Sequence, residues 1–168
     1  TFFWGQSYGG TLEAYAMGAV FRLLPGDSVT FLLVPILEAV AICALTGLIV
    51  HRRLGTAAGW LAAAVVWVFP TAFVLFSTRP MLFYQPTTIL GLGAALMTQY
   101  LLAAPSGRVW RWAVLGGLLG LGWWTSPQIV FFAVPCLVAL GRGVVDPVTR
   151  PTRWAVPLLA AAGVVGAL

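Results

Sequence analysis

The sequence predicts an all-α, polytopic integral membrane protein. Apolar residues make up 61% of the chain and charged residues only 8%, and the mean hydropathy is +0.98. Soluble domains carry charge on about a quarter of their residues. The apolar residues form long runs, and a backbone in lipid must satisfy its own hydrogen bonds, as a helix does. We expect about four full spans, a short two-helix hairpin and an outer interfacial helix.

The full spans are predicted from the lengths of the apolar runs. A bilayer core of about 30 Å requires about 20 apolar residues in a helix. Residues 28–50, 57–77 and 87–104 approach or exceed this length, and residues 154–168 begin a further span. We expect the chain to be part of a longer protein, with an outer loop at 1–27 and a transmembrane bundle at 28–168.

The apolar run at 112–140 is too long for one comfortable span. The sequence TSPQ at 125–128 interrupts it, and proline breaks a helix. Cytoplasmic loops are enriched in arginine and lysine. A hairpin with its tip outside leaves only Arg22 and Arg79 on the outer side, whereas a single tilted helix would carry three more arginines there. We therefore predict two short helices. The glycines within 116–122 permit close packing, either inside the chain or in a dimer.

The net charge of +5 comes from nine arginines and four acids. The arginines lie in short clusters between apolar runs, which indicates membrane topology and not a nucleic-acid partner. Cys43 and Cys136 lie within apolar runs, so no disulfide framework is predicted. No metal cluster, nucleophile triad or phosphate-binding loop is evident, and we expect the single histidine, His51, to be solvated. Membrane lipids are the partners that the composition predicts.

Residues 11–24 form an apolar segment too short to span, which we assign to an interfacial helix on the outer surface. On this helix Glu13 falls in the apolar stripe with Ala16, Met17, Val20 and Leu24, opposite Thr11, Gly18 and Arg22. One interpretation is that Glu13 complements the positive end of the helix dipole. The other is that the stripe packs on the bundle and directs the carboxylate into a cavity.

Two further polar residues are candidates for function. Glu38 lies about 15 Å into the first span, near the midplane, where a carboxylate is costly and marks either a structural or a functional site. Arg79 lies in the outer loop at 78–86, beside aromatic and amide side chains. Its guanidinium is suited to a lipid phosphate, either as a headgroup anchor or as part of a substrate site.

The opening segment FFWGQSYGGTLEAY at residues 2–15 resembles the first outer loop of polyprenol-phosphate-sugar-dependent glycosyltransferases of the GT-C fold. This family includes protein O-mannosyltransferases and aminoarabinose transferases. The segment from Arg52 through Phe76 resembles the family's basic turn and the span after it. The segment GLGWWTSP at 120–127 is similar to its short-helix hairpin.

The resemblance implies transfer of a sugar from a polyprenyl-phosphate carrier to an acceptor at the outer face of the bacterial inner membrane. The family's catalytic aspartate would precede Thr1, so no residue here takes that role. No cofactor is evident, and contact of Glu13 with the acceptor or with a divalent metal stays open. The substrate-binding candidates are Gln6, Tyr8, Glu13, Arg79, Tyr84 and Gln85.

Two other function classes fit the same pattern. A transporter or lipid flippase would use Glu38 and the broken hairpin as its substrate site. A noncatalytic membrane scaffold would tolerate replacement of the outer polar residues. The donor sugar, the acceptor and the oligomeric state are not specified by the sequence.

Overall fold

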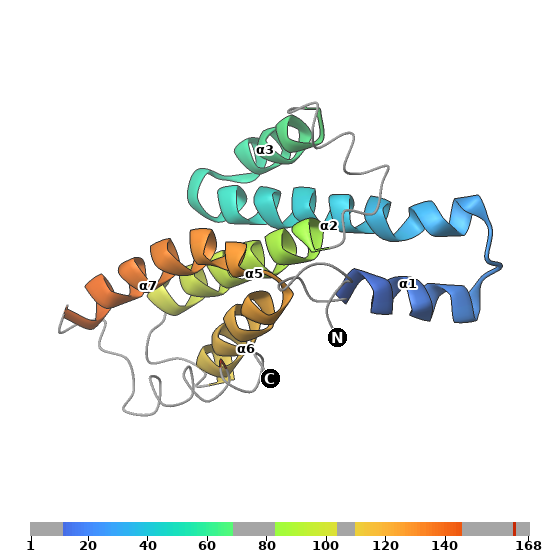
Figure 1. Ribbon diagram of the computed structural model, residues 1–168. Helices are drawn as coiled ribbons and strands as arrows, with labels where there is room; N and C mark the ends of the chain where they lie inside the picture. The colour runs from blue at the N-terminus through green and yellow to red at the C-terminus, as the bar shows by residue number, and fades with distance from the viewer. Residues whose placement is uncertain (1–11, 69–82, 104–109, 146–162, 164–168) are drawn as a thin grey trace. The chain divides into compact units, whose positions relative to one another are not determined.

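The computed structural model describes residues 12–68, 83–103, 110–145 and 163. Every regular element in these ranges is a helix (Figure 1), which confirms the all-α prediction for this part of the chain. The chain forms two compact units, residues 1–89 and 90–168, and each is described by itself.

The first unit begins with two antiparallel helices, α1 (Leu12–Leu23) and α2 (Ser28–Leu54). Asp27 caps α2, because its Oδ1 atom accepts a hydrogen bond of 2.8 Å from the backbone N–H of Thr30. This bond favours the carboxylate and lowers the pKa of Asp27. After this turn α2 runs back alongside α1 (Figure 1). Helix α1 therefore packs on α2, as one interpretation of its apolar stripe expected, and its place at the outer membrane surface remains a prediction.

The faces of α1 follow the predicted helical phase in most positions. Its buried or half-buried residues on the expected side are Glu13, Met17 and Val20. Gly18 and Arg22 are exposed on the other side, as predicted. Ala16 and Leu24 are also exposed, which corrects the wider stripe expected from the sequence. Among the described helices, α1 packs mainly along α2, which fits this narrow buried stripe.

Helix α2 confirms the helix expected at 28–50 and extends it by four residues. Among the described helices, it alone combines the length and hydropathy needed to cross a bilayer. Only 28% of its most apolar window is buried, and Val29 and Leu37 are 70% and 59% exposed. Such an apolar exterior is consistent with membrane association. The other spans remain predictions.

Helix α3 (Thr56–Val68) returns along α2 after a turn at Gly55. Gly55 has a φ of +89°, which glycine adopts readily. The two helices approach closely because both carry glycine at the crossing. A Cβ atom on Gly59 would lie 2.8 Å from the carbonyl oxygen of Gly47. Residues 69–77, the rest of the expected second span, lie outside the described residues, as does most of 154–168.

Helix α5 (Tyr84–Ala103) covers nearly all of the segment expected at 87–104 and begins three residues earlier. It has 20 residues, but polar side chains near both ends lower its mean hydropathy. Its length is therefore sufficient for a membrane span, but its composition is not apolar enough. Its first residues belong to the first unit, and the rest, from Leu90, belong to the second.

The second unit contains the predicted helical break. Helix α6 (Trp110–Thr125) ends before Ser126, a short 3₁₀ turn covers Pro127–Ile129, and α7 (Val130–Val145) follows. Ser126 begins the turn, since its Oγ atom accepts a hydrogen bond from the backbone N–H of Gln128. The prediction of two short helices is confirmed, and the single continuous helix is excluded.

The three helices of the second unit pack around one apolar cluster. Its buried members are Ala94, Leu101, Trp112, Leu115, Cys136 and Leu140. Gly91 lies against the ring of Phe132 at the start of α7, whereas Leu101 and Leu140 meet in the cluster near the ends of their helices. Helices α5 and α7 therefore run in the same direction, with α6 opposed (Figure 1). The arginine topology requires these directions.

The glycines of α6 are used for packing within the chain. A Cβ atom added to Gly120 would collide with the backbone of Gly163, and one on Gly163 would touch the carbonyl oxygen of Gly116. Gly117, on another face of α6, has open space around its Cβ position. The intramolecular alternative accounts for Gly116 and Gly120, so these residues need no dimer to explain them.

Candidate functional site

Glu13 is the most deeply buried acidic residue in the described part of the chain. Its side chain is 1% exposed, although it lies in the first turn of α1, where most surface helices expose their polar residues. The first turn is also where a carboxylate complements the helix dipole. The two interpretations made from the sequence are therefore compatible. The burial shows that the Glu13 side chain lies inside the folded chain, where α1 packs on α2.

Glu38 lies on α2, as far after the turn at Pro25 and Gly26 as Glu13 lies before it. The carboxylate of Glu13 interacts electrostatically with that of Glu38, so the helical hairpin brings the two acids close together. The Oε2 atom of Glu38 is buried and has no hydrogen-bond partner among the described residues. We call Glu13 and Glu38 the acid pair.

The acid pair has a defined chemical requirement. Two carboxylates in apolar surroundings repel each other when both are ionised, and burial adds a desolvation cost. A shared proton, a bound cation or a ligand hydroxyl donating to one oxygen relieves this cost. The pair can therefore orient a hydroxyl-bearing acceptor, contribute two ligands to a divalent cation, or exchange a proton. Within the described ranges, no group of three metal-ligating side chains occurs.

Gln85 and Tyr84 begin α5 within the same compact unit as the acid pair. Gln85 is buried, with 3% of its side chain exposed, whereas Tyr84 is 43% exposed and packs its ring beside Phe83. Next to them, Thr87 is buried and satisfies its hydroxyl by donating to the carbonyl oxygen of Phe83. Gln85 is thus suited to a buried binding site, and Tyr84 to its exposed rim.

Three of the predicted site residues, Gln6, Tyr8 and Arg79, lie outside the described residues. Their role in substrate binding stays a prediction. The structure brings Glu13 and Glu38 together, a pairing that sequence analysis did not make. The signal was present in the spacing, because a hairpin folded at Pro25 and Gly26 sets Glu13 opposite Glu38 when both helices rise equally per residue.

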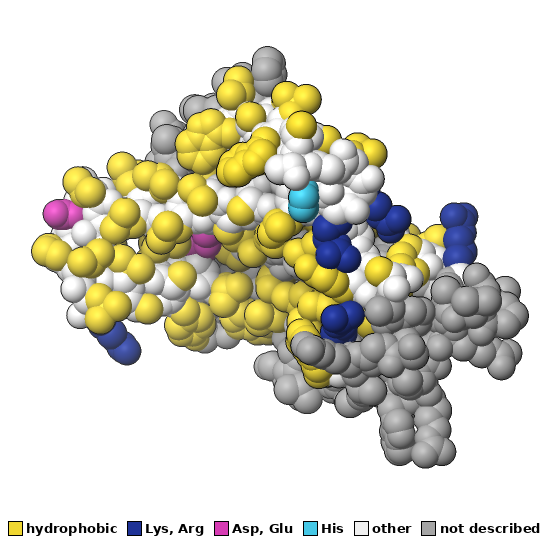
Figure 2. Space-filling view, turned by 180° about the vertical axis from the view of Figure 1, so that it is seen from behind, with side chains coloured by type: hydrophobic (Ala, Val, Ile, Leu, Met, Phe, Trp, Pro, Cys, Tyr) yellow, Lys and Arg dark blue, Asp and Glu magenta, His cyan; other side chains and the backbone are white. Residues whose placement is uncertain are grey.

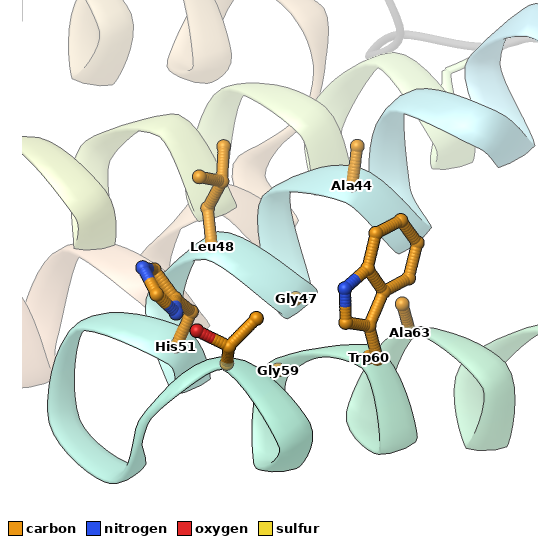
Figure 3. A pocket seen from close by; sticks show the side chains of 8 residues that line it. Ala44, Gly47, Leu48, His51, Gly59, Trp60 and Ala63 are labelled. Atoms are coloured by element: carbon orange, nitrogen blue, oxygen red, sulfur yellow. The ribbon is translucent and has the colours of Figure 1, made fainter.

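Sequence analysis also missed a pocket between α2 and α3. It has a volume of about 350 Å³ and its lining includes His51 and Trp60 (Figure 3). His51 was expected to be solvated, and it is exposed, but it also forms one wall of this pocket. The missed signal was glycine and alanine at helical spacing on both helices, which leaves room between them.

Comparisons with models of known protein families, with curated proteins and with solved structures give no match.

Proposed function

We propose that the protein is a membrane glycosyltransferase that moves a sugar from a polyprenyl-phosphate carrier to an acceptor at the outer face of a bacterial inner membrane. The observation that carries the proposal is that Glu13 is buried and interacts electrostatically with Glu38. The opening segment that resembles the GT-C enzymes is also the segment that contains Glu13. A buried carboxylate in that segment supports a role for it in substrate binding.

In this proposal the acid pair holds the acceptor, and Arg79 serves the donor. A carboxylate accepts hydrogen bonds from sugar or lipid hydroxyl groups and positions them for attack. Negative charge grows on the phosphate that leaves the sugar, and a guanidinium in a water-poor site stabilises that charge. The catalytic base is not assigned to any residue of this chain.

A divalent cation is an open part of the same proposal. The two carboxylates would supply oxygen ligands, which magnesium and manganese prefer, with substrate oxygens and water completing the coordination. If the cation is required, chelation with EDTA abolishes transfer and either metal restores it. Unchanged transfer in EDTA would show that no divalent cation is required. Acceptor binding would then be the only role of the acid pair in this proposal.

The experiment is transfer of a labelled sugar from polyprenyl-phosphate-sugar by the purified full-length protein. Arg79→Ala should weaken donor use, and Arg79→Lys should restore only part of it, because lysine lacks the bidentate geometry of arginine. Arg22, the other arginine predicted on the outer side, supplies the matched control through Arg22→Ala. Wild-type donor use in a folded Arg79→Ala variant would reduce Arg79 to a headgroup anchor.

A transporter or lipid flippase is the second candidate, and the depth of Glu38 favours it. Glu38 lies about 15 Å from the start of α2, near half the thickness of a bilayer core, where transporters bind their substrates and coupling ions. Proton-driven uptake into proteoliposomes that stops in Glu38→Gln would support this candidate. Normal activity in Glu38→Gln would exclude the mechanism that depends on its proton.

A further inference from the structure

The pocket between α2 and α3 has no role in the proposed glycosyl transfer. Its volume of about 350 Å³ lies within the range of small-ligand sites. The lining residues are Ala44, Gly47, Leu48, His51, Thr56, Gly59, Trp60 and Ala63. Most are small or apolar, and Figure 3 shows His51 and Trp60 on opposite sides of the opening.

The pocket opens on the exposed side of the α2–α3 helix pair. Leu48 and Trp60, which form its walls, are 46% and 75% exposed. The glycine pair Gly47 and Gly59 holds the helix backbones together beneath it. Along α2 the lining extends from His51 back to Ala44, about 10 Å at the rise of an α-helix. An elongated apolar group entering from the lipid side would fit this shape.

Basic residues follow the pocket lining at the end of α2. His51, Arg52 and Arg53 form the last turn of α2, and all three are exposed. Figure 2 shows the histidine beside dark blue arginine side chains at the edge of the apolar surface. The sequence contains no acidic residue between Glu38 and Asp146. Positive charge therefore dominates this part of the chain, at the helix end where α2 crosses from apolar to polar sequence.

We infer that the α2–α3 pocket binds an anionic phospholipid, with its acyl chain in the pocket and its phosphate on the arginines of the last turn. The arginine rule places this helix end at the cytoplasmic face, where anionic lipids are attracted to basic clusters. The inference requires that α2 crosses the membrane and does not depend on glycosyl transfer.

The test is native mass spectrometry of the purified full chain with phosphatidylglycerol and phosphatidylcholine in competition. The wild type should retain phosphatidylglycerol preferentially. Each arginine near a membrane surface contributes about fivefold to anionic lipid binding, so Arg52→Gln with Arg53→Gln should weaken it about 25-fold. Replacing both with lysine should keep most of the binding. Arg111→Gln, which alters an arginine predicted on the same side, should retain wild-type preference.

The acyl-chain part of the site has its own variant. Ala44→Leu should fill the pocket and reduce retention of phosphatidylglycerol, whereas Ala64→Leu, on α3 outside the lining, should not. Glycerol phosphate, which lacks acyl chains, should fail to displace the bound lipid. Equal retention of the two lipids by the wild type would overturn the inference. Losses of the same size in the variants and their controls, with gel filtration showing folded protein, would also overturn it.

Discussion

Glu13 on α1 and Glu38 on α2 lie close enough for their carboxylates to interact electrostatically. The two helices are antiparallel (Figure 1), and the two acids are equally distant in sequence from the turn at Pro25 and Gly26. Glu13 is almost completely buried. An apolar helical hairpin that holds two acids in this way retains a feature that costs stability, which is common at functional sites.

The acid pair predicts a specific coupling between two substitutions. At a pH high enough to ionise both acids, Glu13→Gln and Glu38→Gln should each raise the free energy of unfolding, because each removes the same like-charge repulsion. In the double variant the second change should add little, so the cycle should show a coupling of about 0.5–3 kcal/mol. Chemical denaturation in detergent, followed by circular dichroism, measures it. Strictly additive effects would show that the carboxylates do not interact.

The glycine crossing of α2 and α3 predicts opposite effects at two helical glycines. Gly59→Ala should destabilise the protein by about 1–3 kcal/mol, because its new Cβ atom would press on the backbone of Gly47 and on His51. Gly18→Ala should be stabilising by about 0.5–1 kcal/mol, because its Cβ position is open and alanine favours a helix. Thermal unfolding of the two variants compares them. Equal stabilities would contradict the close crossing.

The hairpin predicts that the break at Ser126 faces the same side of the membrane as residues 1–27. Ser126 itself is fully buried, so the exposed neighbour Gln128 is the better labelling site. Cysteines introduced at Gln128 and at exposed Gly141, at opposite ends of α7, should react with an impermeant maleimide from opposite sides. The background would replace Cys43 and Cys136. Labelling of both sites from one side would exclude the predicted topology.

The helices were predictable where a local rule decides the structure. Pro127, preceded by polar residues, marked the break between α6 and α7, and the apolar run from Ser28 marked α2. Pairings between helices were harder to predict, because the hydropathy of one segment does not specify its neighbour. Glu13 was placed correctly in the buried stripe of α1, yet its approach to Glu38 follows only from the fold of the α1–α2 hairpin.

The α2–α3 pocket escaped prediction for a related reason. Alanine and glycine residues in an apolar helix are compatible with tight packing or with a cavity, and only the helix crossing decides between them. At Gly47 and Gly59 the backbones touch, while the adjacent space below Trp60 stays open. Arg79 and the opening segment carried the argument for a phosphate-bearing lipid, and their positions relative to Glu13 remain a prediction.

The measurement that tests the proposed function most directly is sugar transfer by the purified full-length protein and its Glu13→Gln variant, at varied donor and acceptor concentrations. The account predicts that kcat/KM for the acceptor falls by about tenfold or more, the cost of losing a charged hydrogen bond, while donor binding stays nearly unchanged. Gel filtration in detergent verifies folding. Wild-type acceptor kinetics in a folded Glu13→Gln variant would contradict the account.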